Sequence, residues 1–229
     1  MEMRYLEDYC AQKQASPIEH LRACSVVANE YRTTEIDEDL EARERKEIEG
    51  KRRRFNRKAC DLGDPEACFH AAQATLDNRR ARGKEIEQAV KDLAYACLPG
   101  MEQRIPEEVA KAIGDIDELS VEDACYILGM MYYTGYPKGS RRPAVKKDAE
   151  KSYYYLEESC DPERSRYQGC TEIGTISEYG LDNYTDVEDA VWYYKIGCRR
   201  GEAKSCHQLA GVYAQGLLGE GRDLEAAAT

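Results

Sequence analysis

The clearest pattern of apolar and polar positions in this chain runs from Ala190 to Cys206. It predicts the end of one helix, a tight turn at Gly201 and the start of a second helix. A cysteine lies on each side of the turn, Cys198 and Cys206, with seven residues between them. Two antiparallel helices joined this tightly bring such positions close enough for a disulfide.

The same unit recurs along the chain, which indicates an array of helical repeats. With the second cysteine of each unit as the register, five helix starts align at spacings of 44, 57, 45 and 36 residues. Each start has a small residue, a cysteine, a larger apolar residue or alanine, and then a small residue that lets two helices approach closely. The starts are residues 23–28, 67–72, 124–129, 169–174 and 205–210.

Aromatic residues precede the first cysteine of several units and predict the face of a second helix that packs on the next repeat. These stretches are residues 93–95, 153–155 and 192–194. The chain ends fall inside repeats, because residues 5–10 have the pattern of a helix end and residues 223–228 that of a helix start. We therefore expect one all-α repeat domain over 1–229, with about five units and an insertion near 98–123.

Two stretches depart from the repeat. A long charged helix around 37–59 is acidic early and basic late, an order that suits the helix dipole. Its basic end, 51–58, could bind an anion, although a solvated helix end is the interpretation we favour. In the insertion, Pro106 stands where a helix could begin and 107–119 is weakly amphipathic. The insertion could carry binding specificity or act as a spacer.

Composition and charge narrow the possible partners. The formal net charge is −11, with 34% charged and 42% hydrophobic residues, enough for a packed core. No apolar run approaches the roughly eighteen residues of a membrane span, so no membrane insertion is expected. The negative charge argues against nucleic acid and favours a basic partner. The polar N-terminus is not a signal peptide, so we expect Met1 to belong to a trimmed form if the protein is exported.

The cysteines are even in number and regularly placed, which indicates disulfides formed in an oxidising compartment; buried cytosolic thiols are the alternative. They are Cys10, Cys24, Cys60, Cys68, Cys97, Cys125, Cys160, Cys170, Cys198 and Cys206. Without a C-x-x-C pair, and with only His20, His70 and His207 as histidines, no metal site is expected. The sequence has no HExxH, glycine-rich phosphate loop or G-x-S-x-G motif, so we expect no catalytic residues and no cofactor.

The repeats resemble Sel1-like repeats, relatives of the tetratricopeptide repeat, most clearly from Ala124 onward. The third unit carries the resemblance in Ala124, Leu128, Gly129, Tyr132, Gly135, residues 145–148, Tyr153 and Tyr154. Later units depart from the family pattern at Ser177, the usual tyrosine, and at Ala210, the usual glycine. The cysteines resemble those of the Helicobacter-type cysteine-rich repeat proteins. That resemblance implies the pairs Cys10–Cys24, Cys60–Cys68, Cys97–Cys125, Cys160–Cys170 and Cys198–Cys206.

The resemblance also implies a right-handed superhelical solenoid whose concave wall is formed by first helices. By analogy with the tetratricopeptide repeat, the exposed positions of that wall would contact a partner protein. These positions are Phe69, Gln73, Leu76, Tyr126, Met130, Tyr133, Thr171, Thr175, Glu178, His207 and Gly211.

The resemblance favours a non-enzymatic scaffold that binds another protein. Our first functional hypothesis is a periplasmic immunity protein that neutralises a type VI secretion effector of the phospholipase kind, because an acidic scaffold suits a basic toxin surface. Two alternatives remain open. One is a weak β-lactam-binding or β-lactam-hydrolysing protein, which no Ser-x-x-Lys motif supports. The other is an assembly factor of the mitochondrial intermembrane space.

Overall fold

The computed structural model describes residues 3–11, 16–33, 42–78, 80–98, 122–163, 166–180, 185–218 and 223–227. Over these ranges the regular structure is helical, apart from an isolated antiparallel bridge between Tyr136 and Val145. The all-α prediction is confirmed. Most of the predicted insertion lies outside the described residues, as does the acidic beginning of the predicted helix at 37–59.

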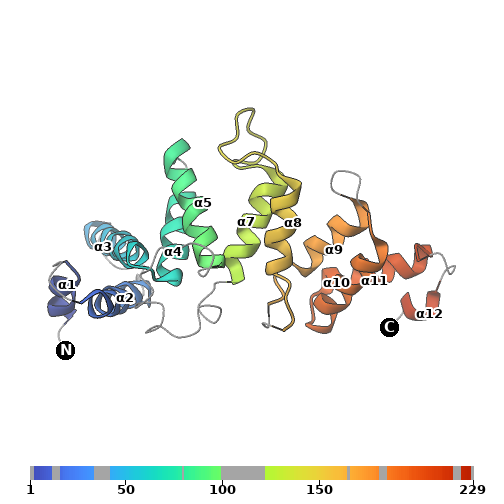
Figure 1. Cartoon of the computed structure of the whole chain (residues 1–229), viewed down its shortest axis with the longest axis horizontal. Helices are drawn as coiled ribbons and strands as arrows, with labels where there is room; N and C mark the ends of the chain where they lie inside the picture. Colours follow the sequence, from blue (N-terminus) through green and yellow to red (C-terminus); the bar gives the residue numbers. More distant parts are fainter. Residues whose placement is uncertain are drawn as a thin grey trace. The chain divides into compact units, whose positions relative to one another are not determined.

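The chain divides into two compact units, Met1–Ala124 and Cys125–Thr229. The helices of the first unit are α1 (Met3–Ala11), α2 (Pro17–Thr33), α3 (Ala42–Asp61), α4 (Pro65–Leu76) and α5 (Gly83–Cys97). Those that follow are α7 (Glu122–Thr134), α8 (Ala149–Glu158), α9 (Cys170–Tyr179), α10 (Val187–Arg199), α11 (Ala203–Gln215) and α12 (Leu224–Ala227). Within each unit, helices adjacent in the chain pack against each other (Figure 1). The expectation of a single domain over 1–229 stays a prediction.

Local sequence explains where the helices begin and turn. Asp64 caps α4 by accepting a hydrogen bond from the Ala67 N–H at 2.9 Å, and Pro65 occupies the first turn. Asp148 and Asp186 cap α8 and α10 in the same way. Between α10 and α11 the chain reverses at Gly201, which has φ +86°, a left-handed conformation that favours glycine. The predicted turn is therefore confirmed.

Small residues let neighbouring helices approach closely, as the repeat pattern predicts. A Cβ added at Gly129 of α7 would lie 2.5 Å from Cγ of Leu156 in α8. A Cβ at Gly174 of α9 would lie 2.7 Å from the ring of Tyr194 in α10. Neither position has room for a side chain unless a neighbour moves, so these glycines set the helix spacing.

The aromatic faces of the second helices fill the space between repeats. Tyr153 of α8 packs against a cluster that includes Ile173 of α9. Tyr194 of α10 is buried together with Val212 of α11, in the following repeat. The prediction that these stretches pack on the next unit is confirmed for both residues.

Candidate functional site

Disulfides link successive helices, mostly near the turns that connect them. The structure pairs Cys10 with Cys24, Cys60 with Cys68, Cys160 with Cys170 and Cys198 with Cys206. The paired Cα atoms lie 4.5–4.9 Å apart. These four pairings are those that the family resemblance implies. Cys97 and Cys125 are also disulfide-bonded, and none of the described cysteines is a free thiol.

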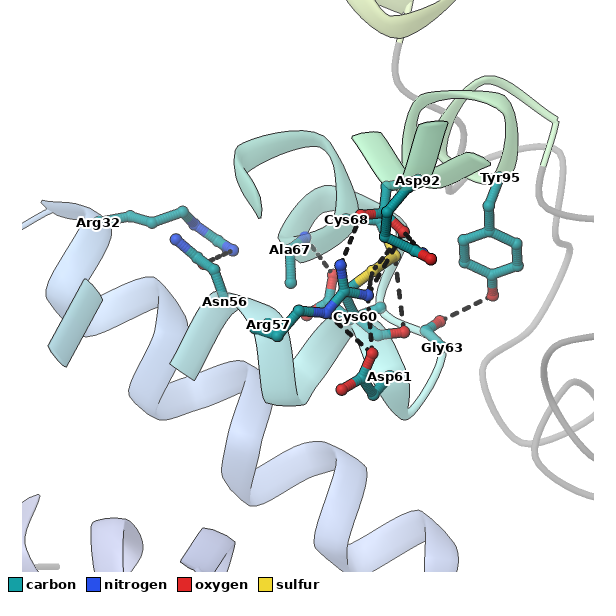
Figure 2. The surroundings of a disulfide bond; sticks show 12 residues. Arg32, Asn56, Arg57, Cys60, Asp61, Gly63, Ala67, Cys68, Asp92 and Tyr95 are labelled. Carbon is teal, nitrogen blue, oxygen red and sulfur yellow. Dashed lines mark hydrogen bonds and ion pairs between the residues drawn. A yellow bond between two sulfur atoms is a disulfide. The ribbon is translucent and has the colours of Figure 1, made fainter. Parts of the chain in front are cut away.

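The Cys60–Cys68 disulfide has an ionic neighbour, the Arg57–Asp92 pair (Figure 2). Asp92 on α5 is only 2% exposed, yet its carboxylate accepts hydrogen bonds from the Arg57 guanidinium and, at 2.9 Å, from the Gln88 side-chain amide. Arg57 on α3 also contacts the Cys60 sulfur and the exposed Asp61 carboxylate. A buried carboxylate therefore ties α5 to the α3–α4 hairpin next to its covalent link.

The surroundings of Arg57 keep its guanidinium charged. Burial disfavours the charged form, but the hydrogen bond and the negative charge of Asp92 outweigh that effect, and the pKa of Arg57 is raised. A cavity of about 470 Å³ opens beside the pair, lined by both signs of charge. Its charged residues are Arg53, Arg57, Lys84, Glu85 and Asp92. With three basic and two acidic residues, and with Arg57 and Asp92 paired to each other, the lining carries little net charge.

The basic end of the predicted charged helix is largely engaged within the chain. Lys51 forms an ion pair with Glu7 of α1 at 3.5 Å, and Arg52 donates a hydrogen bond to the carbonyl of Tyr31 in α2 at 2.8 Å. Together with the Arg57 pair, these contacts join α3 to its neighbours. The structure thus gives the basic stretch a packing role and leaves little of it for an anionic ligand.

Two groups of potential metal ligands lie within the described residues. Cys10, His20 and Cys24 form one, and Cys60, Cys68 and Asp92 form the other, with ligand atoms within 4.8 Å of one another. In each group two of the three atoms are disulfide sulfurs, which lack the thiolate charge that binds a metal. His20 already has a partner for its Nε2, the Cys10 carbonyl at 2.9 Å. In this disulfide form neither group is a metal centre.

The predicted concave-wall residues do not share one environment. Phe69 and Thr171 are buried, with exposed fractions of 6% and 0%, so the expectation that they face a partner needs correction. Each follows a disulfide-bonded cysteine, and the bridge holds this first turn against the neighbouring helix. The Thr171 hydroxyl is hydrogen-bonded to the Ser205 hydroxyl on α11.

Other predicted wall positions already have partners in the same unit. Thr175 and Glu178 on α9 both accept hydrogen bonds from the Tyr194 hydroxyl, and the Glu178 bond is 2.8 Å long. Tyr126 and Met130 on α7 pack against the cluster around Ile173. The half-buried positions of the set are Gln73, Leu76, Tyr126, Met130, Thr175, Glu178 and Gly211. Tyr133 and His207 are exposed, and a partner-binding role for these residues stays a prediction.

The structure exposes aromatic residues that the concave-wall analogy passed over. Trp192 on α10 is 52% exposed and Tyr154 on α8 is 38% exposed. Both stand six residues before the first cysteine of their hairpin, Cys198 and Cys160, and so occupy equivalent repeat positions. This shared distance from the cysteine could have identified the two aromatic residues from the sequence alone. Large exposed aromatic side chains at repeated positions are candidates for contact with a partner.

The segment between α7 and α8 forms a second candidate site. It encloses, with the adjoining helix ends, a hollow of about 1070 Å³. Among its lining residues are Tyr132 and Tyr133 from the end of α7, and the loop residues Lys138, Arg141 and Lys147. The density of Lys and Arg between Gly135 and Asp148 was visible in the sequence, but the hollow was not.

The described helices include none that is both long enough and apolar enough to cross a lipid bilayer. No protein-family model matches the sequence.

Similar curated proteins carry one name, cytochrome c oxidase assembly factor 7. The mouse (Mus musculus) protein is 26% identical over 164 residues, which cover 70% of this chain and 58% of the relative. The human (Homo sapiens) protein is 25% identical, with coverages of 72% and 60%. The Xenopus tropicalis protein is 30% identical over 114 residues, 48% of this chain and 47% of that protein. The chain thus spans less than two thirds of these relatives.

Among solved structures, a Sel1 repeat protein from Oxalobacter formigenes superposes with a TM-score of 0.57 at 16% sequence identity. The match covers 98% of this chain and 52% of the other. At this level of identity the likeness concerns the fold. Together with the disulfide-linked helix hairpins, it shows that the chain has the Sel1-repeat fold.

Proposed function

We propose that this protein is a disulfide-stabilised helical scaffold that binds other proteins during assembly of cytochrome c oxidase. The observation that carries the proposal is the similarity to proteins named for that process over about 70% of the chain. The fold supports it, because stacked helix pairs present long surfaces suited to protein partners. None of the motifs sought in the sequence points to catalysis, so the proposed role is binding.

The disulfides support an oxidising compartment as the place of action. Eight cysteines form four hairpin bridges in the described structure, and such bridges are rare in reducing compartments. The mitochondrial intermembrane space meets this requirement for an assembly factor of cytochrome c oxidase. It is also the compartment of the assembly-factor alternative drawn from the sequence. The periplasm meets it equally, so the bridges alone do not choose between the two.

The similarity to assembly factors is why we place this hypothesis before the immunity protein. None of the relatives described above is named for toxin neutralisation or for β-lactam chemistry. The immunity and β-lactam hypotheses stay predictions. The first requires a complex with a cognate effector, and the second requires turnover of a chromogenic β-lactam above background.

The test is deletion of the gene in the organism that carries it, followed by measurement of assembled cytochrome c oxidase on native gels. We expect loss of the oxidase while other respiratory complexes are retained, and recovery when the wild-type gene is restored. Trp192→Ala together with Tyr154→Ala should restore less oxidase, because these exposed rings are the proposed contacts. Tyr179→Ala, also exposed but without a repeat equivalent, is the matched control.

The amount of the wild-type or variant protein is measured in the same strains, so that a loss of oxidase is not confused with a loss of the protein itself. Normal oxidase levels in the deletion strain would contradict the assembly role. Full recovery by the double variant would leave the assembly role in place and remove the two aromatic residues from the contact surface.

A further inference from the structure

The loop between α7 and α8 has a charge opposite to that of the chain as a whole. It contains five basic residues and one acidic residue between Gly135 and Asp148, in a protein whose net charge is −11. The basic residues are Lys138, Arg141, Arg142, Lys146 and Lys147, and all are exposed. Within the described part of the chain, none of these five side chains forms an ion pair or a hydrogen bond. Among the described residues their charge is therefore not neutralised, and it can pair with groups of a partner.

The acidic residue of the loop, Asp148, is already occupied. Its carboxylate accepts the backbone N–H of Lys151 at 3.0 Å and lies 3.3 Å from the Lys151 ammonium. The hydrogen bond from the Lys151 backbone is the main reason that the pKa of Asp148 is lowered. Asp148 is therefore charged, and its carboxylate already interacts with Lys151 of α8. Among the described residues, the loop cations have no counterion.

The loop is held in place at its base. Tyr136 and Val145 exchange two backbone hydrogen bonds of 2.9 and 3.0 Å, and the Asp148 N–H donates to the Tyr132 carbonyl at 3.0 Å. Val145 itself is buried. Figure 1 shows the segment extending away from the ends of α7 and α8. Cations carried on an anchored hairpin lose less freedom on binding than cations on a free tail.

The hollow beneath the loop combines charge with aromatic surface. Lys138, Arg141 and Lys147 line it, and Tyr133, 37% exposed, forms part of the wall with Tyr132. Its volume of about 1070 Å³ is at the upper limit for a small-molecule pocket. A space of this size, open to solvent, fits several side chains of an extended peptide.

We propose that this cationic hollow, lined by residues 132–135, 137–141, 143, 147–149 and Gly180, binds an acidic segment of a partner protein. Carboxylates of the segment would pair with the loop cations while its less polar side chains lie against Tyr133. A membrane surface fits less well, because residues 137–143 carry no large apolar side chain to enter the bilayer and the acidic chain would be repelled by anionic lipids. The inference does not depend on the cytochrome c oxidase role.

The experiment measures fluorescence anisotropy of a fluorescein-labelled decapeptide rich in Asp and Glu, titrated with the full-length protein at low salt. We expect saturable binding that weakens about tenfold or more in the triple variant K138Q/R141Q/K147Q. The matched control is R43Q/K46Q/K91Q, which removes three exposed cations elsewhere and changes the net charge equally. It should retain at least half of the wild-type affinity.

Further measurements separate this proposal from its rivals. Raising the salt from about 50 to about 500 mM should weaken the peptide complex, because exposed charges are screened. Tyr133→Ala should weaken it without removing the salt dependence. The proposal is overturned if the two triple variants bind the peptide equally well or if the peptide does not bind. It is also overturned if inorganic phosphate, at a concentration equal to that of the peptide carboxylates, displaces the peptide completely. Binding of anionic vesicles or RNA without binding of the peptide also overturns it.

Discussion

At the scale of single residues, the Arg57–Asp92 pair offers a direct comparison of a buried and an exposed carboxylate. The same guanidinium contacts Asp92, which is buried, and Asp61, which is exposed. Without the Asp92 carboxylate, the Arg57 guanidinium loses its buried counterion and the Gln88 amide loses its charged acceptor. Without the exposed Asp61 carboxylate, water can solvate the Arg57 guanidinium on that side.

We therefore expect Asp92→Asn to lower the free energy of unfolding by about 2–3 kcal/mol, near the lower end for a broken buried pair. Asp61→Asn should cost less than about 1 kcal/mol. Urea unfolding followed by circular dichroism measures both. Equal losses in the two variants would show that burial at Asp92 does not govern the strength of the pair.

The partner-binding positions show where residue-level prediction from sequence fails. Counting positions from the cysteine treats every first helix alike, whereas the neighbours differ from unit to unit. Thr171 is buried because Ser205 of α11 meets it, while His207, at the equivalent place in the last hairpin, is exposed. The sequence fixes the helical phase of these residues but not the identity of the side chain that comes to lie opposite each of them.

At the scale of helices, much of the architecture could be predicted from the cysteines and the small residues. Cys198 and Cys206 flank a turn whose glycine has the expected left-handed backbone, and their bond is present. The loop between α7 and α8 could not be predicted to this level, because its form depends on the pairing of Tyr136 with Val145. Neither residue belongs to the helical pattern.

The glycines at helix crossings give a second prediction. Gly174→Ala should destabilise the protein by about 1–3 kcal/mol, because the new methyl group would meet the Tyr194 ring and the Ala190 carbonyl. Gly211→Ala is the matched control, since a Cβ there finds only the Gln215 side chain, at 3.7 Å. Alanine in that helix should be neutral or stabilising by up to about 1 kcal/mol. Thermal unfolding of both variants measures these changes in stability. A Gly174→Ala protein as stable as the wild type would show that the α9–α10 contact can adjust.

At the scale of the whole molecule, charge and covalent links act on different properties. The net charge of −11 sets which partners approach, and the cationic hollow is a local exception to it. The disulfides instead act on the unfolded chain, since each limits the conformations open to it. The described bridges all close short segments, with sequence separations of 8 to 14 residues. Each joins neighbouring helices, so the covalent network reinforces local hairpins.

The third prediction follows from adding those bridges together. A short closed loop contributes about 2.5–3 kcal/mol in the chain-entropy account, so the four described hairpin bridges contribute about 10 kcal/mol. The total free energy of unfolding of an ordinary domain is only about 5–15 kcal/mol. Full reduction should therefore abolish the cooperative thermal transition seen by circular dichroism, whereas the single-bridge variant C60A/C68A should keep it at a lower midpoint. Mass mapping after alkylation verifies the extent of reduction. A fully reduced chain that still unfolds cooperatively at the wild-type temperature would mean that helix packing alone maintains the fold.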